Sequence, residues 1–266
     1  MTTYLGVCGW PVAHSRSPAM HNAALAEVGL DWRYLLLPLP PHLFPETVRA
    51  LPPLGFRGVN VTIPHKEAAL ALADEASPAA RAIGAANTLT FTPGGAIHAD
   101  NTDAPGLLEA LAPVCPPAGR RALVLGAGGS ARAAVWALRD AGAEVSVWNR
   151  TAARAEALAQ ALGARAVAVP EDADIVVNCT SVGLSDSDTT FKTFPLRADD
   201  WSAGTCVVDM VYREGGTVLL AEARRRGAGA VDGLQILVAQ GALSFERWTG
   251  TTAPRAAMRA AATRSP

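Results

Sequence analysis

Leu123-Val-Leu-Gly126-Ala-Gly128-Gly129-Ser-Ala131 has the pattern of a buried strand, a glycine turn and the start of a helix. The glycine spacing fits the G-x-G-x-x-G/A fingerprint of dinucleotide-binding βαβ units, with Ala131 in the last position. Gly126 permits the tight turn, Gly128 lets the backbone approach a pyrophosphate, and Ala131 allows close packing of helix and strand. The alternative is a purely structural glycine turn. We expect a bound dinucleotide, held by Gly126, Ala127, Gly128, Gly129, Ser130 and Ala131.

Apolar runs alternate with alanine-rich helical stretches on both sides of this segment. Such alternation predicts an α/β protein built from βαβ units with mostly parallel sheets. Ser17-Pro18 and Ser77-Pro78 each offer an N-cap serine followed by proline, and Pro64 is expected to open a helix. The predicted strands are 4–7, 34–37, 59–62, 87–91, 122–125, 144–148, 174–178 and 205–209, and the predicted later helices are 130–141, 152–162, 234–248 and 253–262.

A domain boundary is expected close to residue 101. The proline-rich stretch 111–119 comes just before the first strand of the glycine-loop unit and has the composition of a surface connection. The last two predicted helices have no strand between them, so they are expected to pack back on the first domain. The chain is thus predicted to contain a domain of residues 1–101, completed by 238–266, and a Rossmann-like domain of residues 102–237.

Composition favours small-molecule chemistry. The 266 residues carry a formal net charge of −1, which gives none of the basic field that nucleic acid or anionic membranes attract. No apolar run reaches about 18 residues, and the N-terminus lacks the pattern of a signal peptide. The four cysteines show neither CxxC nor zinc-like spacing, so no metal is expected. We expect a cytoplasmic monomer or homodimer that binds neither nucleic acid nor membranes.

The ribose-reading position predicts the type of dinucleotide. NAD enzymes carry an acid about 20 residues after the glycine loop, whereas this chain has Asn149-Arg150-Thr151 there. An arginine without a neighbouring carboxylate suits a 2′-phosphate, and Arg154 adds a second positive charge one helical turn later. NADP is therefore expected rather than NAD. The alternative is that Arg150 and Arg154 are ordinary solvated helix charges.

Lysine is scarce in this chain. Of 23 lysines and arginines only Lys66 and Lys192 are lysines, and Lys66 ends the stretch Asn60-Val-Thr-Ile-Pro-His-Lys66. Arginine stays protonated in proteins, whereas a lysine can give up and regain a proton, so Lys66 is a candidate acid–base residue. The alternative is a lysine left by chance at an exposed helix start. Lys192 ends the polar stretch 185–192, an expected surface loop, and receives no chemical role.

Several motifs in a fixed order resemble those of the shikimate dehydrogenase family. The resemblance extends over nearly the whole chain. It rests on Ser15-Arg-Ser17-Pro, Asn60-Val-Thr62-Ile-Pro-His-Lys66, Ala86-Asn87-Thr88, Asp100-Asn-Thr-Asp103, Gly126-Ala-Gly-Gly-Ser, Asn149-Arg-Thr151, Asn178-Cys-Thr-Ser-Val-Gly183, Asp209-Met-Val-Tyr212 and Asp232-Gly-Leu-Gln-Ile-Leu-Val-Ala-Gln240.

The resemblance implies reversible hydride transfer between NADPH and 3-dehydroshikimate, with an N-terminal substrate domain and a Rossmann-like cofactor domain. It implies that Lys66 and Asp103 form the catalytic pair. The carboxylate of the substrate would meet Ser15 and Ser17, with Tyr212 as a further donor. By the same resemblance, the ring hydroxyls would meet Thr62, Lys66, Asn87, Asp103 and Gln240, and the cofactor would also meet Thr180, Ser181, Met210 and Gly233.

Several of these residues have structural alternatives. Ser17 also suits a helix cap, Asn87 a turn and Met210 plain core packing, while Gln240 is compatible with an ordinary helix face. The chain departs from the family pattern at Trp10, Val218 and Ile236, none of which is a reacting group. Rival functions are quinate or aminoshikimate dehydrogenation and a catalytically silent NADP-binding protein.

Overall fold

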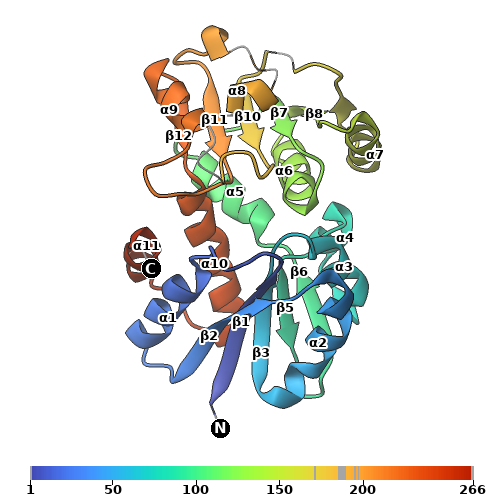
Figure 1. Ribbon diagram of the computed structural model, residues 1–266, viewed down its shortest axis with the longest axis vertical. Coiled ribbons are helices and arrows are strands. Elements are labelled where there is room, and N and C mark those ends of the chain that lie inside the picture. The colour runs from blue at the N-terminus through green and yellow to red at the C-terminus, as the bar shows by residue number, and fades with distance from the viewer. Residues whose placement is uncertain (1, 171, 185–189, 195, 197, 265–266) are drawn as a thin grey trace. The chain divides into compact units, whose positions relative to one another are not determined.

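The computed structural model describes residues 2–170, 172–184, 190–194, 196 and 198–264. The chain divides into two compact units, unit 1 of Met1–Asp103 with Leu237–Pro266 and unit 2 of Ala104–Ile236. Each unit contains a six-stranded sheet, and helices accompany both sheets (Figure 1). The predicted α/β class is therefore confirmed. None of the helices in the described residues has the length and apolar character needed to cross a membrane.

The sheet of unit 1 is mixed, with strand order β2-β1-β3-β5-β6-β4. Strand β5 runs antiparallel to both of its neighbours, and the other pairs are parallel. The strands are β1 (Thr3–Gly9), β2 (Trp32–Pro38), β3 (Phe56–Val61), β4 (Glu75–Ala76), β5 (Thr88–Phe91) and β6 (Ile97–Asp100). The helices are α1 (Ser17–Glu27), α2 (Phe44–Ala50), α3 (Lys66–Leu72), α4 (Pro78–Ile83), α10 (Gly233–Thr249, whose first turn lies in unit 2) and α11 (Arg255–Thr263).

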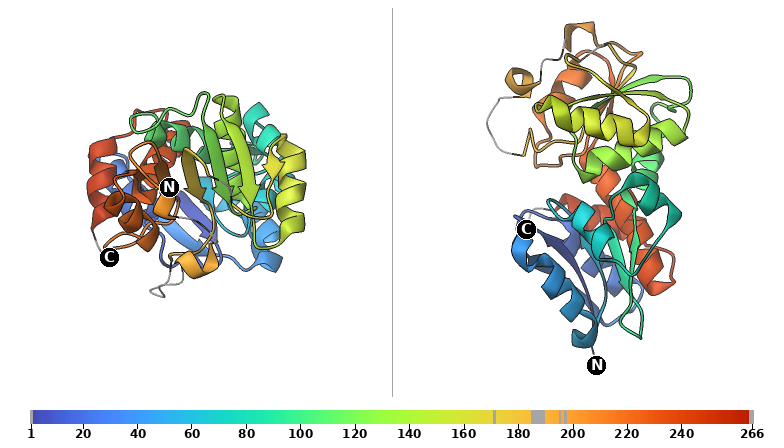
Figure 2. Two further views of the ribbon diagram at one scale, coloured as in Figure 1. Left: turned by 90° about the horizontal axis from the view of Figure 1, so that it is seen from above. Right: turned by 90° about the vertical axis from the view of Figure 1, so that its right-hand side faces the viewer.

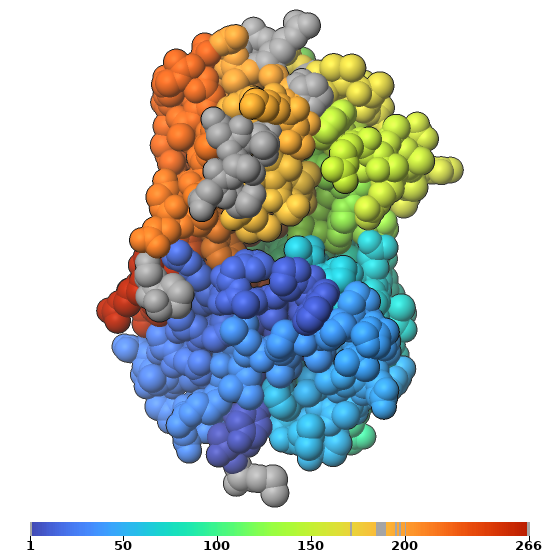
Figure 3. Space-filling model, in the orientation of Figure 1, coloured from blue at the N-terminus to red at the C-terminus, as the bar shows by residue number. Residues whose placement is uncertain are grey.

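Alternation along β3 and β5 divides the core of unit 1 into two layers. Val59 and Leu89 join a buried cluster with side chains of α2 and α3. On β3, Gly58 lies against α10, where Trp248 Nε1 donates a hydrogen bond of 3.1 Å to Leu89 O. The face of unit 1 visible in Figure 3 is formed mostly by the blue and cyan first third of the chain, with little of the red C-terminal helices.

Strand β2 forms one edge of this sheet, and the side chain of Asn22 covers its middle. Asn22 Nδ2 donates to Tyr34 O at 2.9 Å, and Tyr34 N donates to Asn22 Oδ1 at 2.8 Å. These are the two backbone groups through which a further strand would pair with Tyr34. Leu35 and Leu36 on the same strand are about two-fifths exposed, at 39% and 40%.

Unit 2 has the strand order β12-β11-β10-β7-β8-β9, with every pair parallel. This is the doubly wound order, in which the two halves of the sheet meet between β7 and β10. The strands are β7 (Arg121–Leu125), β8 (Glu144–Trp148), β9 (Arg165–Ala166), β10 (Ile175–Asn178), β11 (Cys206–Asp209) and β12 (Gly229–Val231). The helices are α5 (Asp103–Leu111, whose first residue belongs to unit 1), α6 (Gly129–Asp140), α7 (Ala152–Leu162), α8 (Thr190–Thr193) and α9 (Val218–Arg225).

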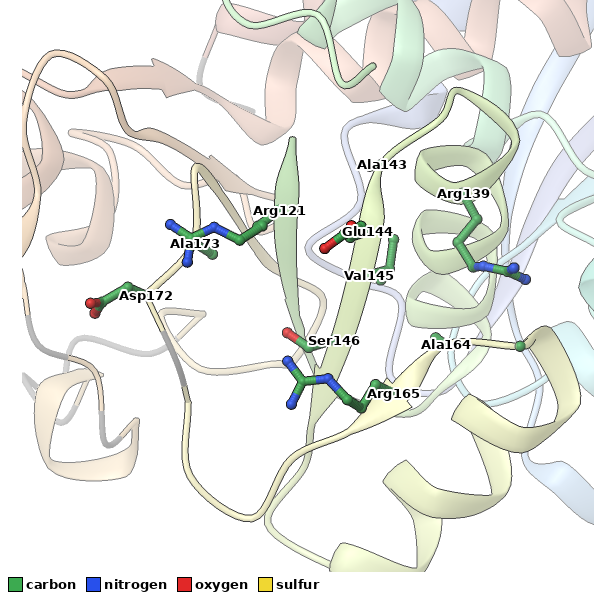
Figure 4. Close-up of a pocket in the computed structure, with 11 residues that line it drawn as sticks. Arg121, Arg139, Ala143, Glu144, Val145, Ser146, Ala164, Arg165, Asp172 and Ala173 are labelled. Atoms are coloured by element: carbon green, nitrogen blue, oxygen red, sulfur yellow. The ribbon is translucent and has the colours of Figure 1, made fainter. Parts of the chain in front are cut away.

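Helices cover the two faces of this sheet unevenly (Figure 2). Helices α5, α6 and α7 pack on one face, whereas α9 packs on the other face beside β11. A pocket of about 490 Å³ opens at the amino ends of β7 and β8, near Arg121, Glu144, Ser146 and Arg165 (Figure 4). Ligands of doubly wound sheets bind at the carboxyl ends of the strands, so this pocket is not the expected dinucleotide site.

Most predicted elements lie within a few residues of the observed ones, but some details differ. The helix expected from Ser17 as N-cap has Arg16 there instead, and Ser17 is buried in its first turn. Pro64 stands in a turn before α3, which begins at Lys66. Lys192 lies in the short helix α8, whereas residues 185–189 of the expected loop are outside the described part of the chain. Strands β4, β6, β9 and β12 and helix α9 were not predicted.

Candidate active site

A buried ion pair between Lys66 and Asp103 forms the centre of the candidate site. Lys66 is the first residue of α3 and Asp103 the first of α5, and the distance from Lys66 Nζ to Asp103 Oδ2 is 2.5 Å. Both residues are nearly enclosed, with exposed fractions of 7% and 5%. A lysine left by chance on an exposed helix start would not have this environment. The position of Asp103 at the start of α5 also favours its negative charge through the helix dipole.

Asn87 binds the second carboxylate oxygen of Asp103. Its Nδ2 donates to Asp103 Oδ1 at 2.8 Å, and its Oδ1 accepts the backbone N–H of Thr102 at 2.7 Å. Because a backbone N–H can only donate, this contact fixes which end of the amide faces the carboxylate. The Asn87 side chain therefore does much more than satisfy a turn.

Gln240 joins the same cluster from helix α10. Its Nε2 donates to Leu237 O at 2.8 Å, which turns its Oε1 towards Asn87 Nδ2 at 3.2 Å. Gln240 is 8% exposed, so it is not an ordinary polar residue on a solvated helix face. The fold of unit 1 thus gathers Lys66, Asn87, Asp103 and Gln240, although up to 174 positions separate them along the chain.

The other substrate residues predicted in unit 1 lie on two segments. Ser17 is 4% exposed, and its backbone N–H donates to Ser15 Oγ at 3.3 Å, so the two serines are neighbours. Since Ser17 does not cap α1, its hydroxyl is not used as a helix cap. Thr62 follows the end of β3 and is partly buried. His65 stacks on Phe44 and binds Leu39 O at 2.7 Å, which is a structural role.

The glycine loop lies at the carboxyl end of β7, at the switch point of the unit 2 sheet. Gly126 has a φ of +116°, and a Cβ there would come within 3.2 Å of Cys179 O. Gly128 is the N-cap of α6, and a Cβ on it would meet nothing within 4 Å. The backbone of this turn therefore has open space at the N-terminus of a twelve-residue helix. That combination fits a pyrophosphate, while the fully buried Ala131 packs α6 on the sheet.

A buried polar network organises the loops that follow β10 and β11. Asp209 accepts hydrogen bonds from Thr217 Oγ1 at 2.7 Å, Asn178 Nδ2 at 2.9 Å and the Val211 N–H at 3.0 Å. Asn178 also accepts from Thr180 N and Thr180 Oγ1, at 2.9 and 2.8 Å. Complete burial raises the pKa of Asp209 from 3.8 to about 6, and the three donated bonds oppose this shift only in part.

The raised pKa of Asp209 predicts a pH dependence of stability. Between about pH 4 and pH 6 the folded chain holds this proton more tightly than the unfolded chain, so its contribution is present below pH 4 and lost as the pH rises through 6. In Asp209→Asn the group cannot titrate. We expect the wild-type free energy of unfolding, minus that of the variant, to fall by about 3 kcal/mol from pH 4 to pH 7. Urea titrations would measure it, and parallel curves would contradict it.

The remaining predicted residues of unit 2 lie near the carboxyl edge of its sheet. Met210 is partly buried, and its Sδ lies 3.4 Å from Cys179 Sγ. Ser181 is exposed in the loop after β10, and Tyr212 is partly buried in the loop after β11. A Cβ on Gly233 would come within 2.7 Å of Val211 O, so only glycine lets α10 begin this close to that loop.

The segment predicted to bind the ribose follows β8. Asn149 Nδ2 donates to Thr151 O at 2.9 Å and shapes the turn into α7. Arg150 and Arg154 are both exposed, and neither has a carboxylate beside it in sequence. Their guanidinium groups are therefore accessible to an anion at this edge of the sheet.

Sequence reasoning missed several buried polar residues around the site. Four of them, Asn60, Thr88, Thr102 and Ser244, lie around Asn87, and Asn178 with Asp209 supports the loops after β10 and β11. A polar side chain inside an otherwise apolar strand was the available signal, since such groups are buried only with partners. Among the described residues, no group of three or more His, Cys, Asp or Glu side chains is arranged to hold a metal ion.

Comparison with known proteins assigns the family. Three family models match: the shikimate dehydrogenase substrate-binding domain over residues 7–89, shikimate/quinate 5-dehydrogenase over 113–183, and the shikimate 5′-dehydrogenase C-terminal domain over 233–263. The NADP(+) shikimate dehydrogenase of Methylobacterium radiotolerans is 50% identical over 261 residues, covering 92% of this chain and 90% of the relative. The chain belongs to the shikimate dehydrogenase family.

Solved structures of the shikimate dehydrogenase family share the whole fold. The Thermus thermophilus enzyme, in complex with NADP(H) and shikimate, has a TM-score of 0.88 and 45% identity, with 98% of both chains covered. Quinate dehydrogenase from Corynebacterium glutamicum, in complex with NAD, has a TM-score of 0.86 and 29% identity over 98% of both chains. The same fold therefore occurs in a shikimate dehydrogenase and in a quinate dehydrogenase.

Proposed function

We propose that the chain catalyses the reversible NADPH-dependent reduction of 3-dehydroshikimate to shikimate, a step towards the aromatic amino acids. The observation that carries this proposal is the buried Lys66–Asp103 pair, whose carboxylate accepts a hydrogen bond from Asn87 Nδ2. Asn87 Nδ2 also donates to Gln240 Oε1. Similarity to NADP-dependent shikimate dehydrogenases at 45–50% identity supports the same reaction. Retention of the reacting pair argues against a silent NADP-binding protein.

The proposed role of Lys66 follows from the charge that reduction creates. Hydride addition to a ketone leaves an alkoxide, which must gain a proton, and oxidation of the alcohol needs the same group as a base. The Lys66 ammonium can donate that proton, and Asp103 holds the ammonium in place through a 2.5 Å contact. Asn87 and Gln240 orient this pair and offer polar atoms to ring hydroxyls, while Ser15 and Ser17 offer hydroxyls for the substrate carboxylate.

NADP fits the residues at the carboxyl edge of the unit 2 sheet. When bound, the dinucleotide supplies the hydride. The open backbone at Gly128 and the start of α6 would hold the pyrophosphate, and Arg150 with Arg154 would hold the 2′-phosphate. We assign Thr180, Ser181, Met210 and Gly233 to the nicotinamide side of this site, and Tyr212 to the substrate carboxylate.

A turnover assay tests this function and its rivals. Purified protein mixed with shikimate and NADP⁺ should produce NADPH, followed by its absorbance. Quinate and aminoshikimate, each at the same concentration, should give a lower kcat/KM. Faster turnover of either compound would identify that compound as the substrate. No turnover of any of the three would favour a catalytically silent NADP-binding protein.

Arg150→Ala tests the assignment of the 2′-phosphate site. Loss of a charge-assisted contact to phosphate is expected to raise the KM for NADP⁺ by about 10- to 100-fold. The KM for NAD⁺ should change little because NAD⁺ lacks this phosphate, so the second cofactor serves as an internal control. An equal change with both cofactors would remove Arg150 from the 2′-phosphate site.

We also expect the protein to be cytoplasmic and either a monomer or a homodimer. Cys8, Cys115 and Cys206 are buried thiols, which suits the reducing cytoplasm. Cell fractionation would test this location. Light scattering of the purified protein would distinguish the monomer from the homodimer, both of which are compatible with the fold.

A further inference from the structure

A directed chain of buried hydrogen bonds leads from β2 to the carboxylate of Asp103. Tyr34 Oη donates to Asn60 Oδ1 at 2.8 Å, and Asn60 Nδ2 lies 3.2 Å from Thr88 Oγ1. Thr88 Oγ1 in turn lies 3.1 Å from Asn87 Oδ1, and Asn87 Nδ2 donates to Asp103 at 2.8 Å. All five residues are at most 5% exposed.

The direction of donation is set by contacts that allow only one polarity. Asn60 Nδ2 also reaches Asn87 O at 3.2 Å, and because a carbonyl only accepts, the opposite end of the Asn60 amide must accept from Tyr34. The Asn87 amide is fixed in the same way by the backbone N–H of Thr102. Thr88 therefore accepts from Asn60 and donates to Asn87, so that every group donates towards Asp103.

Ser244 on α10 holds the middle of this chain in place. Its Oγ donates to Gln240 O at 3.0 Å and accepts from Asn60 Nδ2 at 2.8 Å. It also lies 3.1 Å from Thr88 Oγ1. Because its own proton is donated to Gln240 O, the Ser244 hydroxyl can only accept in its contacts with Asn60 and Thr88. It links the chain to the helix that carries Gln240.

We propose that Tyr34, Asn60 and Thr88 are positioning residues that set how strongly Asp103 binds the Lys66 ammonium. Chains of hydrogen bonds polarise one another in a low dielectric, so each donor upstream makes Asn87 a better donor to the carboxylate. An Asp103 carboxylate that accepts a strong hydrogen bond from Asn87 attracts the Lys66 ammonium less strongly. If the chain of hydrogen bonds is weakened, Lys66 holds its proton more tightly, and its base form appears at higher pH. This inference rests on the proposed role of Lys66.

Other titratable groups near the chain do not account for such an effect. His21 stacks on Tyr34 at 4.3 Å, and burial lowers its pKa to about 3, so it is neutral throughout the working range. Asp100 lies opposite Thr88 in the sheet, and its carboxylate is paired with Arg247 at 2.5 Å. The Lys66–Asp103 pair is thus the charged group at the end of the chain.

Substitution of Thr88 tests the proposal. Thr88→Val keeps the shape but removes the hydroxyl, and we expect kcat for shikimate oxidation to fall about 10-fold. The pH at which the oxidation rate is half-maximal should rise by about half a unit. Thr88→Ser restores the hydroxyl and should return both values close to wild type. Thr90→Val makes the same change two residues along β5, outside the chain, and should leave the pH profile unchanged.

Tyr34→Phe provides a second test that preserves packing, because the ring that stacks on His21 remains. Its pH profile should move in the same direction as that of Thr88→Val, by a smaller amount, and it decides the matter if the valine variant does not fold. Wild-type profiles in both Thr88→Val and Tyr34→Phe would overturn the proposal, as would equal shifts in Thr88→Val and Thr90→Val. Absence of turnover in the wild-type protein would instead refute the proposed function.

Discussion

Lys66→Ala is expected to lower kcat for shikimate oxidation by about 10²- to 10⁴-fold, the usual scale of acid–base catalysis. Alanine can neither give nor take the proton, whereas Asp103 and Asn87 still form part of the pocket, so the KM for shikimate should stay within several-fold. Steady-state kinetics with NADP⁺ would measure both constants. The wild-type oxidation rate should also increase with pH until the lysine is deprotonated.

The second lysine of the chain supplies the matched control. Lys192 is exposed on α8, so Lys192→Ala removes the same side chain where it has no proposed contact with substrate or cofactor. Its kcat and KM should equal those of the wild type. Near-normal turnover in Lys66→Ala would remove Lys66 from the proton-transfer step, as would a wild-type rate that is flat from neutral to alkaline pH.

Gly58→Ala is expected to lower the free energy of unfolding by about 3 kcal/mol, at the upper end for overpacking of a core. The new Cβ would stand 2.6 Å from Leu89 O and would also overlap the indole of Trp248. Leu89 O belongs to the neighbouring strand, and the indole is held to it by a hydrogen bond, so neither group can give way easily. Urea unfolding followed by tryptophan fluorescence would measure the loss.

Gly94→Ala is the control for this substitution. Gly94 is exposed in the turn between β5 and β6, and the only contact of an added Cβ would be with Thr92 Oγ1 at 3.9 Å. We expect its stability to stay within about 0.5 kcal/mol of the wild type. Equal stabilities of the two variants would show that α10 can shift away from β3 without cost.

Local sequence signals predicted the segment from β7 to α7 of the Rossmann-like unit well. The helix 152–162 and the strand 144–148 have the predicted bounds. The helix ends where Gly163 adopts a left-handed conformation with a φ of +65°, which an alanine-rich segment followed by glycine predicts. Such signals depend on residues within one turn of each other, so the sequence alone is enough to predict these elements.

Other elements depend on contacts that the local sequence does not contain. Pro64 suits the turn before a helix as well as the first turn itself, and only the folded unit selects the turn. Strand β4 has two residues and exists because it pairs with β6. Pairing of this kind is decided by tertiary structure, and short strands carry little periodicity of their own.

The candidate site shows the same division. Lys66 was a candidate acid–base residue because lysine is rare in this chain, whereas its pairing with Asp103 was inferred only from family resemblance. The hydroxyls of Thr88 and Ser244 meet across 156 positions of sequence, and nothing near either residue marks the contact. Buried polar networks close only when distant elements pack, so their members are visible in the sequence but their partners are not.

The side chain of Asn22 determines what the edge of the unit 1 sheet can do. Two exposed leucines on an edge strand would invite a neighbouring chain to add a strand, which is the first step of sheet-to-sheet aggregation. An incoming strand would first have to displace both Asn22 hydrogen bonds at Tyr34. A strand of a second copy is therefore kept from pairing with β2 at Tyr34 for as long as α1, which carries Asn22, stays folded.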